Sequence, residues 1–474
     1  MDSGVRAKST VERSLEIEFV RRAELEKAEQ EIGRLREENA QLRRQLETAR
    51  RGQKRQAAPF SKGEPKENPK KPGRKSGDKH GAHHRRAVPE RVDEHYVAAL
   101  ASKCGCGGAV ELEKTKRQIQ EDIVRRKVVR EFKVEIGRCA GCGQYHQGHH
   151  PLQTSDALDA AGVQVGPEAV ALVTILNKRM GLSLGRAVEV LRTGYGLKMS
   201  RGGAWRAMER LAGKAKPTYE AACEVVKQSL VVWIDETGWK VGGRLQWLWV
   251  AVSERATVYR IQAGRGYQQA VQLVGAGFTG CLVHDGWAPY LRFQQALHQS
   301  CLQHIVRRCR TMIDIGSQSG VVELASRVKE IAGKGMEVRD RRERREISEQ
   351  GMWTAAGRLA AELERVLSLP WMDEADLRLV KHLRRQQPHL FTYLHCPGVE
   401  ATNNRGERAI RPAVMARKVW GGSRTANGAM VQQVLVSVLE TCHQQAKDSF
   451  DWVTGLLRGS PAVVLDLAAR PGSG

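Results

Sequence analysis

The segment Val231–Trp239 constrains the fold of this chain more than any other stretch. Four apolar residues are followed directly by two carboxylates, Asp235 and Glu236. A continuous apolar run of this length predicts a buried strand. Because an unpaired carboxylate is costly to bury, an acid at the end of such a strand needs a partner, and a divalent metal is one. The alternative is a strand that simply reaches solvent at Asp235.

The same pattern recurs downstream, where Cys281-Leu-Val-His is followed by Asp285 and a glycine. Three meandering strands, a helix and further strands alternating with helices predict an α/β fold, a ribonuclease H-like mixed sheet. Adjacent strand residues point to opposite faces, so Asp235 and Glu236 should not bind one metal together. The further elements expected in this core are strands at 244–252, 256–261 and 297–303 and a helix at 267–274.

The balance of charge indicates the class of partner. The chain has 474 residues and a net charge of +24, which favours a polyanion, most often nucleic acid. The alternative is a basic protein with no such partner. No apolar run approaches the ~20 residues of a membrane span, so we expect a cytoplasmic, nucleoid-associated protein and no membrane partner.

Residues 11–50 predict a coiled-coil dimerisation helix. Apolar residues between Leu25 and Ala49 alternate steps of three and four, with Leu35 and Leu42 at d positions. Asn39 at an a position favours a parallel pair, so we expect a homodimer or higher assembly through residues 25–49. The alternative is an amphipathic helix docked on the chain's own body.

Two segments of unlike composition follow. Residues 51–91 are rich in Lys, Arg, Pro and Gly and predict a basic, flexible linker. Residues 92–152 contain two close cysteine pairs that turn through glycine, which predicts a zinc-finger-like domain holding structural Zn²⁺. One of three nearby histidines could replace a thiolate. The predicted zinc ligands are Cys104, Cys106, Cys139 and Cys142, and the histidines are His146, His149 and His150.

The remaining segments are predicted to be mostly helical. Residues 160–229 contain two short helices, 182–191 and 204–211, that resemble a helix-turn-helix, although ordinary packing against the core explains them equally well. A helix-turn-helix would present Arg201, Arg206 and Arg210. The core is expected at 230–312 and 396–445, interrupted by a helical insertion at 313–395 and followed by a C-terminal tail at 446–474.

Four motifs follow one another along the predicted core. They are Asp235-Glu-Thr-Gly-Trp239, His284-Asp-Gly286, Cys301-Leu-Gln-His304-Ile-Val-Arg-Arg308 and Thr402-Asn-Asn-Arg-Gly-Glu-Arg408-Ala-Ile-Arg-Pro412. In this order they resemble the motifs of the insertion sequence 66 family of bacterial transposases. The succession of coiled coil, basic linker, zinc-finger-like segment and core is also similar to that family, as is the run from Arg417 to Arg424.

The resemblance implies a catalytic DDE triad of Asp235, Asp285 and Glu407. Three carboxylates would hold two Mg²⁺ (or Mn²⁺) ions, which stabilise the entering and leaving oxygens of an in-line phosphodiester displacement. Glu400 could replace Glu407 as the third acid. Glu407 could also serve a capping box with Asn404 at the start of a helix.

The implied function is a DNA transposase that cleaves and joins DNA at the ends of an insertion sequence. Its partners would be double-stranded element ends, target DNA and small accessory proteins of the same element. The alternatives are a catalytically silent or domesticated DNA-binding regulator, and a metal-dependent nuclease without joining activity. The predicted DNA-binding residues are Arg408, Arg411, His304, Arg307, Asn403 and Arg424.

Overall fold

The computed structural model describes residues 27, 30–35, 37–39, 41–42, 89–123, 126–153, 157–158, 163–316, 322–460 and 465–467. The chain divides into two compact units, Met1–Glu121 and Asp122–Gly474. No helix in the described ranges is both long and apolar enough to cross a bilayer.

In the first unit, the described residues between 27 and 42 are helical. Ile32, Leu35 and Leu42 are 47%, 49% and 56% exposed, so three of the apolar positions assigned to the seam face solvent in the single chain. The rest of the segment 11–50 lies outside the described residues, as does nearly all of the linker 51–91. The coiled-coil dimer and the flexible linker therefore stay predictions.

The second unit is a mixed α/β structure built on a five-stranded sheet in the order β5-β4-β3-β6-β7. β3, β4 and β5 are antiparallel neighbours, whereas β6 pairs parallel with both β3 and β7. The strands span Val231–Val241, Arg244–Val252, Thr257–Gln262, Cys281–His284 and Leu297–Ser300.

β3 is longer than the sequence pattern predicts. It continues past Asp235 and Glu236 to Val241, so the carboxylates lie in the middle of the strand and not at its end. The extension forms because Val241 pairs with Arg244 across a two-residue turn of Gly242 and Gly243, both with positive φ. Each glycine adopts that conformation without the steric penalty of a side chain.

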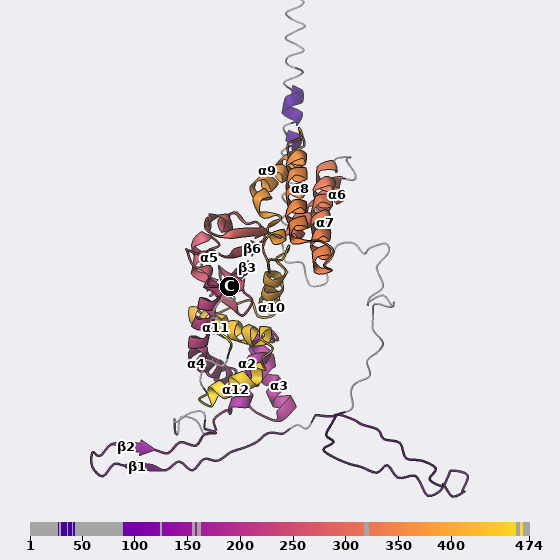
Figure 1. The fold of residues 1–474 in the computed structure, drawn as a ribbon. Helices are drawn as coiled ribbons and strands as arrows, with labels where there is room; N and C mark the ends of the chain where they lie inside the picture. The colour runs from indigo at the N-terminus through magenta and orange to yellow at the C-terminus, as the bar shows by residue number, and fades with distance from the viewer. Residues whose placement is uncertain are drawn as a thin grey trace, which may run out of the picture. The chain divides into compact units, whose positions relative to one another are not determined.

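The two faces of the sheet carry separate apolar cores. Val232 and Ile234 of β3 pack with α4 (Arg201–Lys227), α5 (Tyr267–Val274) and most of α11 (Ala426–Gln444). Trp233 points to the opposite face, where α10 (Asn404–Trp420) and the helices of the insertion pack. In Figure 1, β3 and β6 lie between α6–α9 on one side and α2, α3, α4 and α12 on the other.

The helical segment ahead of the sheet differs from its prediction in length. The second of the two helices expected there, α4, continues to Lys227 because Leu211, Ala215 and Ala222 keep its apolar stripe buried against α11 and the sheet. This helix exposes Arg201, Arg206 and Arg210. Exposure alone does not distinguish a helix-turn-helix from ordinary packing, so the helix-turn-helix stays a prediction. The other helices of this layer are α2 (Pro167–Lys178), α3 (Leu184–Tyr195) and α12 (Ser449–Leu457).

The segment 313–395 is largely helical, as its sequence indicates, and the helix that leads into it begins earlier in the chain. The strand predicted at 297–303 ends at Ser300, and α6 begins at Leu302. The helices here are α6 (Leu302–Gly316), α7 (Glu323–Glu343), α8 (Glu349–Leu367) and α9 (Glu374–Gln386), followed by the 3-10 turns η2 (Gln387–His389) and η3 (Thr392–Leu394). A further 3-10 turn, η1 (Ala288–Arg292), follows β6.

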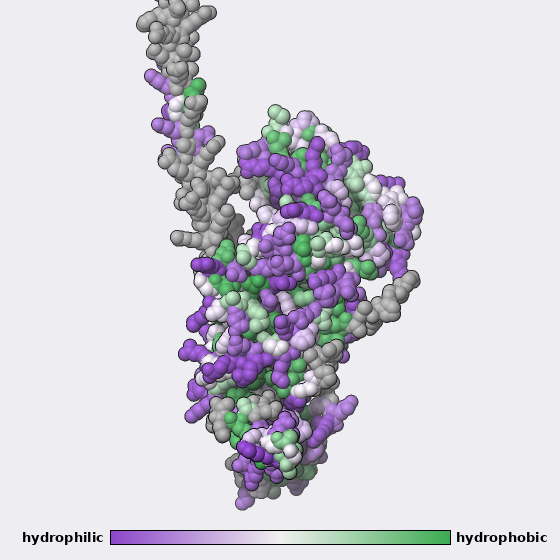
Figure 2. Space-filling model, turned by 90° about the vertical axis from the view of Figure 1, so that its left-hand side faces the viewer, coloured by the Kyte–Doolittle hydropathy of each residue, from purple (hydrophilic) through white to green (hydrophobic). Residues whose placement is uncertain are grey.

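The start of the second unit contains a small two-stranded sheet. β1 (Ile136–Arg138) and β2 (Tyr145–Gln147) pair antiparallel, and both strands are exposed. Across the wider molecular face drawn in Figure 2, hydrophilic residues are interspersed with small hydrophobic patches.

Candidate active site

Asp235 projects from the middle of β3 toward the face that α10 covers. Burial is the first cause that raises the pKa of its carboxyl to about 7, and the charges of Glu236, Asp285 and Glu407 raise it further. The backbone N–H of Glu236 donates to Asp235 Oδ1 at 2.9 Å and opposes this shift. Three other carboxylates are therefore close enough to disfavour ionisation of Asp235.

Asp285 follows β6 directly and lies beside Asp235 because the two strands are parallel neighbours. Trp233 is in register with Val283, so both acids come two residues after a paired position. Trp287 donates its backbone N–H to Asp285 Oδ1 at 2.8 Å, and the chain turns at Gly286, whose φ is 88°. A positive φ favours glycine, which explains the Asp-Gly sequence at this turn.

The turn after Asp285 is held by a residue from the insertion. Gln386 of α9 is fully buried; its Nε2 donates to the Gly286 carbonyl at 3.0 Å. Its Oε1 accepts from Ser300 Oγ at 2.5 Å. The insertion thus takes part in positioning the second acid. Sequence reasoning missed Gln386, and no local pattern marks a residue that acts 100 positions from its partner.

Glu407 lies in the first turn of α10, where a negative side chain is favoured by the helix dipole. The start of this helix is fastened beside Asp235, because Asn403 Nδ2 donates to the Ile234 carbonyl at 2.8 Å. The Asn403 side chain makes no cap hydrogen bond, and helical residues begin at Asn404. A carboxylate oxygen of Glu407 lies 3.5 Å from His304 Nδ1, so the structure gives no support to the capping-box interpretation.

The two rival acids are engaged elsewhere. Glu236 points to the other face of β3, where Arg265 Nε lies 2.5 Å from its Oε1 and the Tyr290 hydroxyl donates to its Oε2. Glu400 forms an ion pair with Arg405 at 2.7 Å. Neither arrangement directs a carboxylate toward Asp235 from the α10 side.

His304 lies at the site on the first turns of α6. Burial lowers the pKa of its imidazole first, and Arg307 lowers it further, while Glu407 and Asp285 raise it. Its Nδ1 is buried, and the 3.5 Å contact with Glu407 does not form a hydrogen bond. Cys301 is buried at the junction between β7 and α6, directly before this helix.

Comparison with known proteins gives the family. The sequence model described as "Transposase IS66 family" matches residues 162–431, which covers more than half of the chain and all the acids described above. The chain belongs to the IS66 transposase family. It is also similar to the uncharacterized protein y4qI of Sinorhizobium fredii, with 24% identity over 327 residues, 62% of this chain and 60% of that protein. The chain thus spans less than two thirds of this relative's length.

In this IS66 family member, the three acids fit a divalent cation. Carboxylate oxygens are the ligands that Mg²⁺ and Mn²⁺ prefer. Burial is the largest cause of the raised pKa of Asp235 and the charges of Glu236, Asp285 and Glu407 add to it, so a cation among Asp235, Asp285 and Glu407 would favour the ionised carboxylate. These three residues would hold the metal.

The residues predicted to contact DNA are placed differently from one another. Arg307 on α6, Arg408 and Arg411 on α10, and Arg424 after it are all exposed. Asn403 differs from these arginines, because its side chain is fully buried and bonded to β3, and its DNA contact stays a prediction. Its place in this IS66 family member is to attach α10 to the strand that carries Asp235.

The segment from Arg417 to Arg424, at the end of α10, is hydrogen-bonded to the C-terminal half of β3. Ser423 donates its N–H to the Lys240 carbonyl at 2.8 Å and accepts from Gly242 N–H at 3.0 Å, and its Oγ accepts from Trp239 Nε1 at 3.1 Å. Arg417 donates to Thr237 Oγ1 at 3.1 Å and to the Gly238 carbonyl. α10 is therefore attached to β3 on both sides of Asp235.

The predicted zinc ligands form two similar turns. Gly107 donates to the Cys104 carbonyl at 2.8 Å, and Gly143 donates to the Cys139 carbonyl at 2.9 Å. Hydrogen bonds to the second cysteine of each turn lower the pKa of Cys104 and of Cys139, as a zinc thiolate requires. The two turns belong to different units, so a site that joins all four cysteines stays a prediction.

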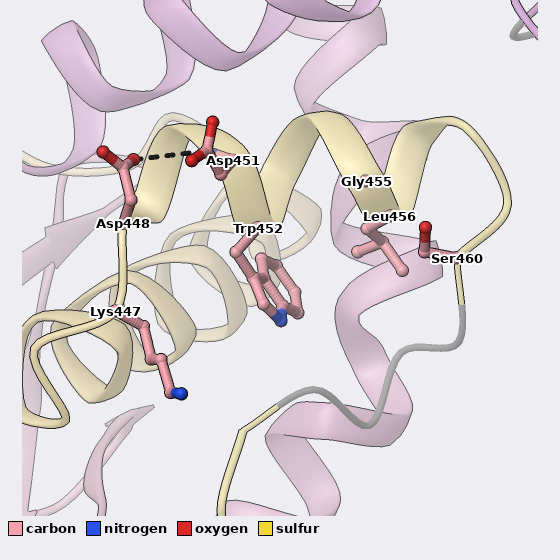
Figure 3. Close-up of a pocket in the computed structure, with 7 residues that line it drawn as sticks. All are labelled: Lys447, Asp448, Asp451, Trp452, Gly455, Leu456 and Ser460. Atoms are coloured by element: carbon pink, nitrogen blue, oxygen red, sulfur yellow. Dashed lines mark hydrogen bonds between the residues drawn. The ribbon is translucent and has the colours of Figure 1, made fainter.

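A separate pocket lies along α12 (Figure 3). Asp448 caps this helix by accepting N–H groups from Phe450 at 2.6 Å and from Asp451 at 3.2 Å. The pocket is lined by Lys447, Asp448, Asp451, Trp452, Gly455, Leu456 and Ser460. Its carboxylate Asp448 is used in the helix cap, which explains the arrangement without a ligand.

Proposed function

We propose that this protein is a DDE-type DNA transposase with a ribonuclease H-like core. The observation that carries the proposal is that Asp235 in β3, Asp285 directly after the neighbouring β6 and Glu407 in the first turn of α10 come from elements bonded to one another, with the carboxyl of Asp235 buried among them. These acids come from two parallel neighbouring strands and a helix that is attached to one of them. The sheet order, with three antiparallel strands followed by two parallel ones, supports the same fold.

In the proposed reaction, Asp235, Asp285 and Glu407 hold two Mg²⁺ or Mn²⁺ ions. The bound ions would supply stabilisation of the entering and leaving oxygens during in-line displacement at a phosphodiester. Asp235 is fixed by its strand and Asp285 by the Gly286 turn, so their oxygens are positioned before DNA binds. Arg408 and Arg411 extend along the same helix as Glu407 and would contact DNA phosphates.

The assignment of roles predicts which substitutions stop cleavage. Asp235→Asn and Glu407→Gln should abolish Mg²⁺-dependent cleavage of element-end DNA, because each removes a charged oxygen ligand. DNA affinity should stay within a few-fold, since phosphate contacts supply most of it. Glu400→Gln is the matched control, because Glu400 lies on the same segment but is paired with Arg405.

The outcomes separate the hypotheses. Retained cleavage by Asp235→Asn would contradict the triad, and loss in Glu400→Gln alone would replace the third acid. Wild-type protein that binds the ends but never cuts, even with companion proteins supplied, would favour the regulator. Cleavage without strand-transfer products would favour the nuclease.

A further inference from the structure

Three side chains of unlike chemistry converge at the edge of the acid site. The Cys301 sulfur, a His304 ring nitrogen and a Glu407 carboxylate oxygen all lie within 4.8 Å of one another. They come from the β7–α6 junction and from the first turn of α10. Sulfur, nitrogen and oxygen donors together are unusual beside a magnesium site, because Mg²⁺ binds oxygen almost exclusively.

The Cys301 side chain is buried, and its sulfur accepts a hydrogen bond from the backbone. Asn403 donates its backbone N–H to this sulfur at 3.2 Å. Backbone N–H groups directed at a cysteine sulfur are a common outer shell of metal thiolates.

The other two donors have the spacing of neighbouring ligands. In a tetrahedral zinc site with bonds of about 2.0–2.1 Å, nitrogen and oxygen ligands lie about 3.4 Å apart. His304 Nδ1 lies 3.5 Å from Glu407 Oε1. This nitrogen is buried and has no hydrogen-bond partner, which is the state of a ligand without its cation.

We propose that Cys301, His304 and Glu407 bind Zn²⁺, with water in the fourth position, and that this binding inhibits the enzyme. The donor set matches a zinc site with three protein ligands and one open position. Binding displaces the thiol proton of Cys301 to solvent and leaves the cysteine as a thiolate. Because Glu407 then serves Zn²⁺, the acid triad loses its third member. The inhibitory part rests on the proposed function, and the binding does not.

Binding is tested on the full-length protein with Co²⁺ as a spectroscopic probe for Zn²⁺. Wild-type protein should take up one more equivalent than Cys301→Ser, with a matching loss of sulfur-to-cobalt charge-transfer absorption in the variant. Serine keeps an acceptor for the backbone N–H of Asn403. Cys396→Ser is the control, because Cys396 is a thiol outside the donor group. All three proteins retain the four cysteines of the predicted zinc finger.

His304→Gln provides a second test of the same site, and it should lose the same equivalent without loss of the other cysteine signals. Equal uptake and equal spectra in wild type, Cys301→Ser and His304→Gln would overturn the proposed site. These measurements need no catalytic activity, so they stand even if the transposase assignment fails.

Inhibition is tested by adding Zn²⁺ to Mg²⁺-dependent cleavage, with each protein compared with its own zinc-free rate. Wild type and Cys396→Ser should lose activity at a Zn²⁺ concentration at least tenfold lower than Cys301→Ser, roughly 1.4 kcal/mol in binding. Equal sensitivity of wild type and Cys301→Ser would overturn the inhibitory role while the binding result remained.

Discussion

The carboxyl of Asp235 is buried in the middle of β3, where its ionised form is unfavourable. Its pKa of about 7 lies well above the ordinary value of 3.8, with burial as the largest cause. Between these two pH values the folded state holds a proton that the unfolded chain has released. The folded protein therefore becomes less stable as pH rises across this interval, and it stays less stable above it.

Substitution of Asp235 by asparagine should stabilise the protein when no metal is bound. At about pH 8 the variant avoids the cost of a buried carboxylate, and its free energy of unfolding should exceed that of wild type by a few kcal/mol, at ~1.4 kcal/mol per pKa unit. At about pH 5 the gain should be smaller, because the folded wild type is still protonated. Thermal unfolding in EDTA measures both differences. A gain independent of pH would show that the carboxyl of Asp235 is not held near pKa 7.

The local sequence pattern predicted the placement of single residues only where it also determines the direction of their side chains. The alternation along β3 predicted that Asp235 and Glu236 face opposite ways, and they do, with Glu236 bonded to Arg265 and Tyr290. The roles of Asn403 and Gln386 had no such signal. Their partners, the carbonyls of Ile234 and Gly286, are 169 and 100 residues away. A contact of that kind is set by packing, which one sequence does not reveal.

At the scale of elements, α10 is the helix that brings the third acid, Glu407, to the site. It carries Glu407 at one end and continues into the 421–424 segment at the other, and both ends bond to β3. Gly422 makes the second attachment possible. A Cβ there would lie 2.3 Å from the Lys240 carbonyl oxygen, and its φ is 120°. Gly421 also has a positive φ, of 84°, but a Cβ there would meet no atom within 4 Å.

Alanine at these two glycines should therefore have unequal effects. Gly421→Ala should cost about 1 kcal/mol of stability from its positive φ alone. Gly422→Ala should cost at least about twice that, because β3 and α10 must separate to admit the methyl group. Denaturant unfolding gives both values, and cleavage should fall more in Gly422→Ala because Glu407 shifts. Equal losses would indicate that the close approach to Lys240 does not limit the structure.

The elements themselves were predicted better than their ends. Strands around 231, 244 and 257 were expected because β-branched and aromatic runs are separated by turn residues. The expected strand through Gln303 was wrong from Cys301 onward, since α6 begins at Leu302 and packs Leu302 and Ile305 into the core. α4 was expected to be short, yet burial against α11 carries it across Pro217.

At the scale of the whole molecule, net charge and its distribution determine how DNA would be held. The chain carries +24, and arginines on α10 and α6 near the acids are exposed. If the protein neutralises about six phosphates, its DNA affinity should fall roughly a thousandfold when the salt concentration rises fourfold. The predicted dimer would double the available basic surface, and it rests on a segment mostly outside the described residues.

Removal of one phosphate contact should change the salt dependence by a defined amount. Arg408→Gln should reduce the slope of log affinity against log salt by about one, and weaken binding to all DNA sequences alike. Arg344→Gln is the control, because Arg344 is an exposed arginine paired with Glu346 at 2.6 Å. Fluorescence anisotropy over a salt series measures the slopes. If the two variants gave the same slope, Arg408 would have no phosphate contact of its own.

The late position of α10 in the chain has a consequence for protein synthesis. A ribosome completes β3 through β7 long before it reaches Asn403, whose bond to Ile234 spans 169 residues. The growing chain therefore contains Asp235 and Asp285 before Glu407 is made. Messages cut short before this helix would yield proteins that lack the third acid, the exposed Arg408 and Arg411 of α10, and α11, which packs against the other face of the sheet.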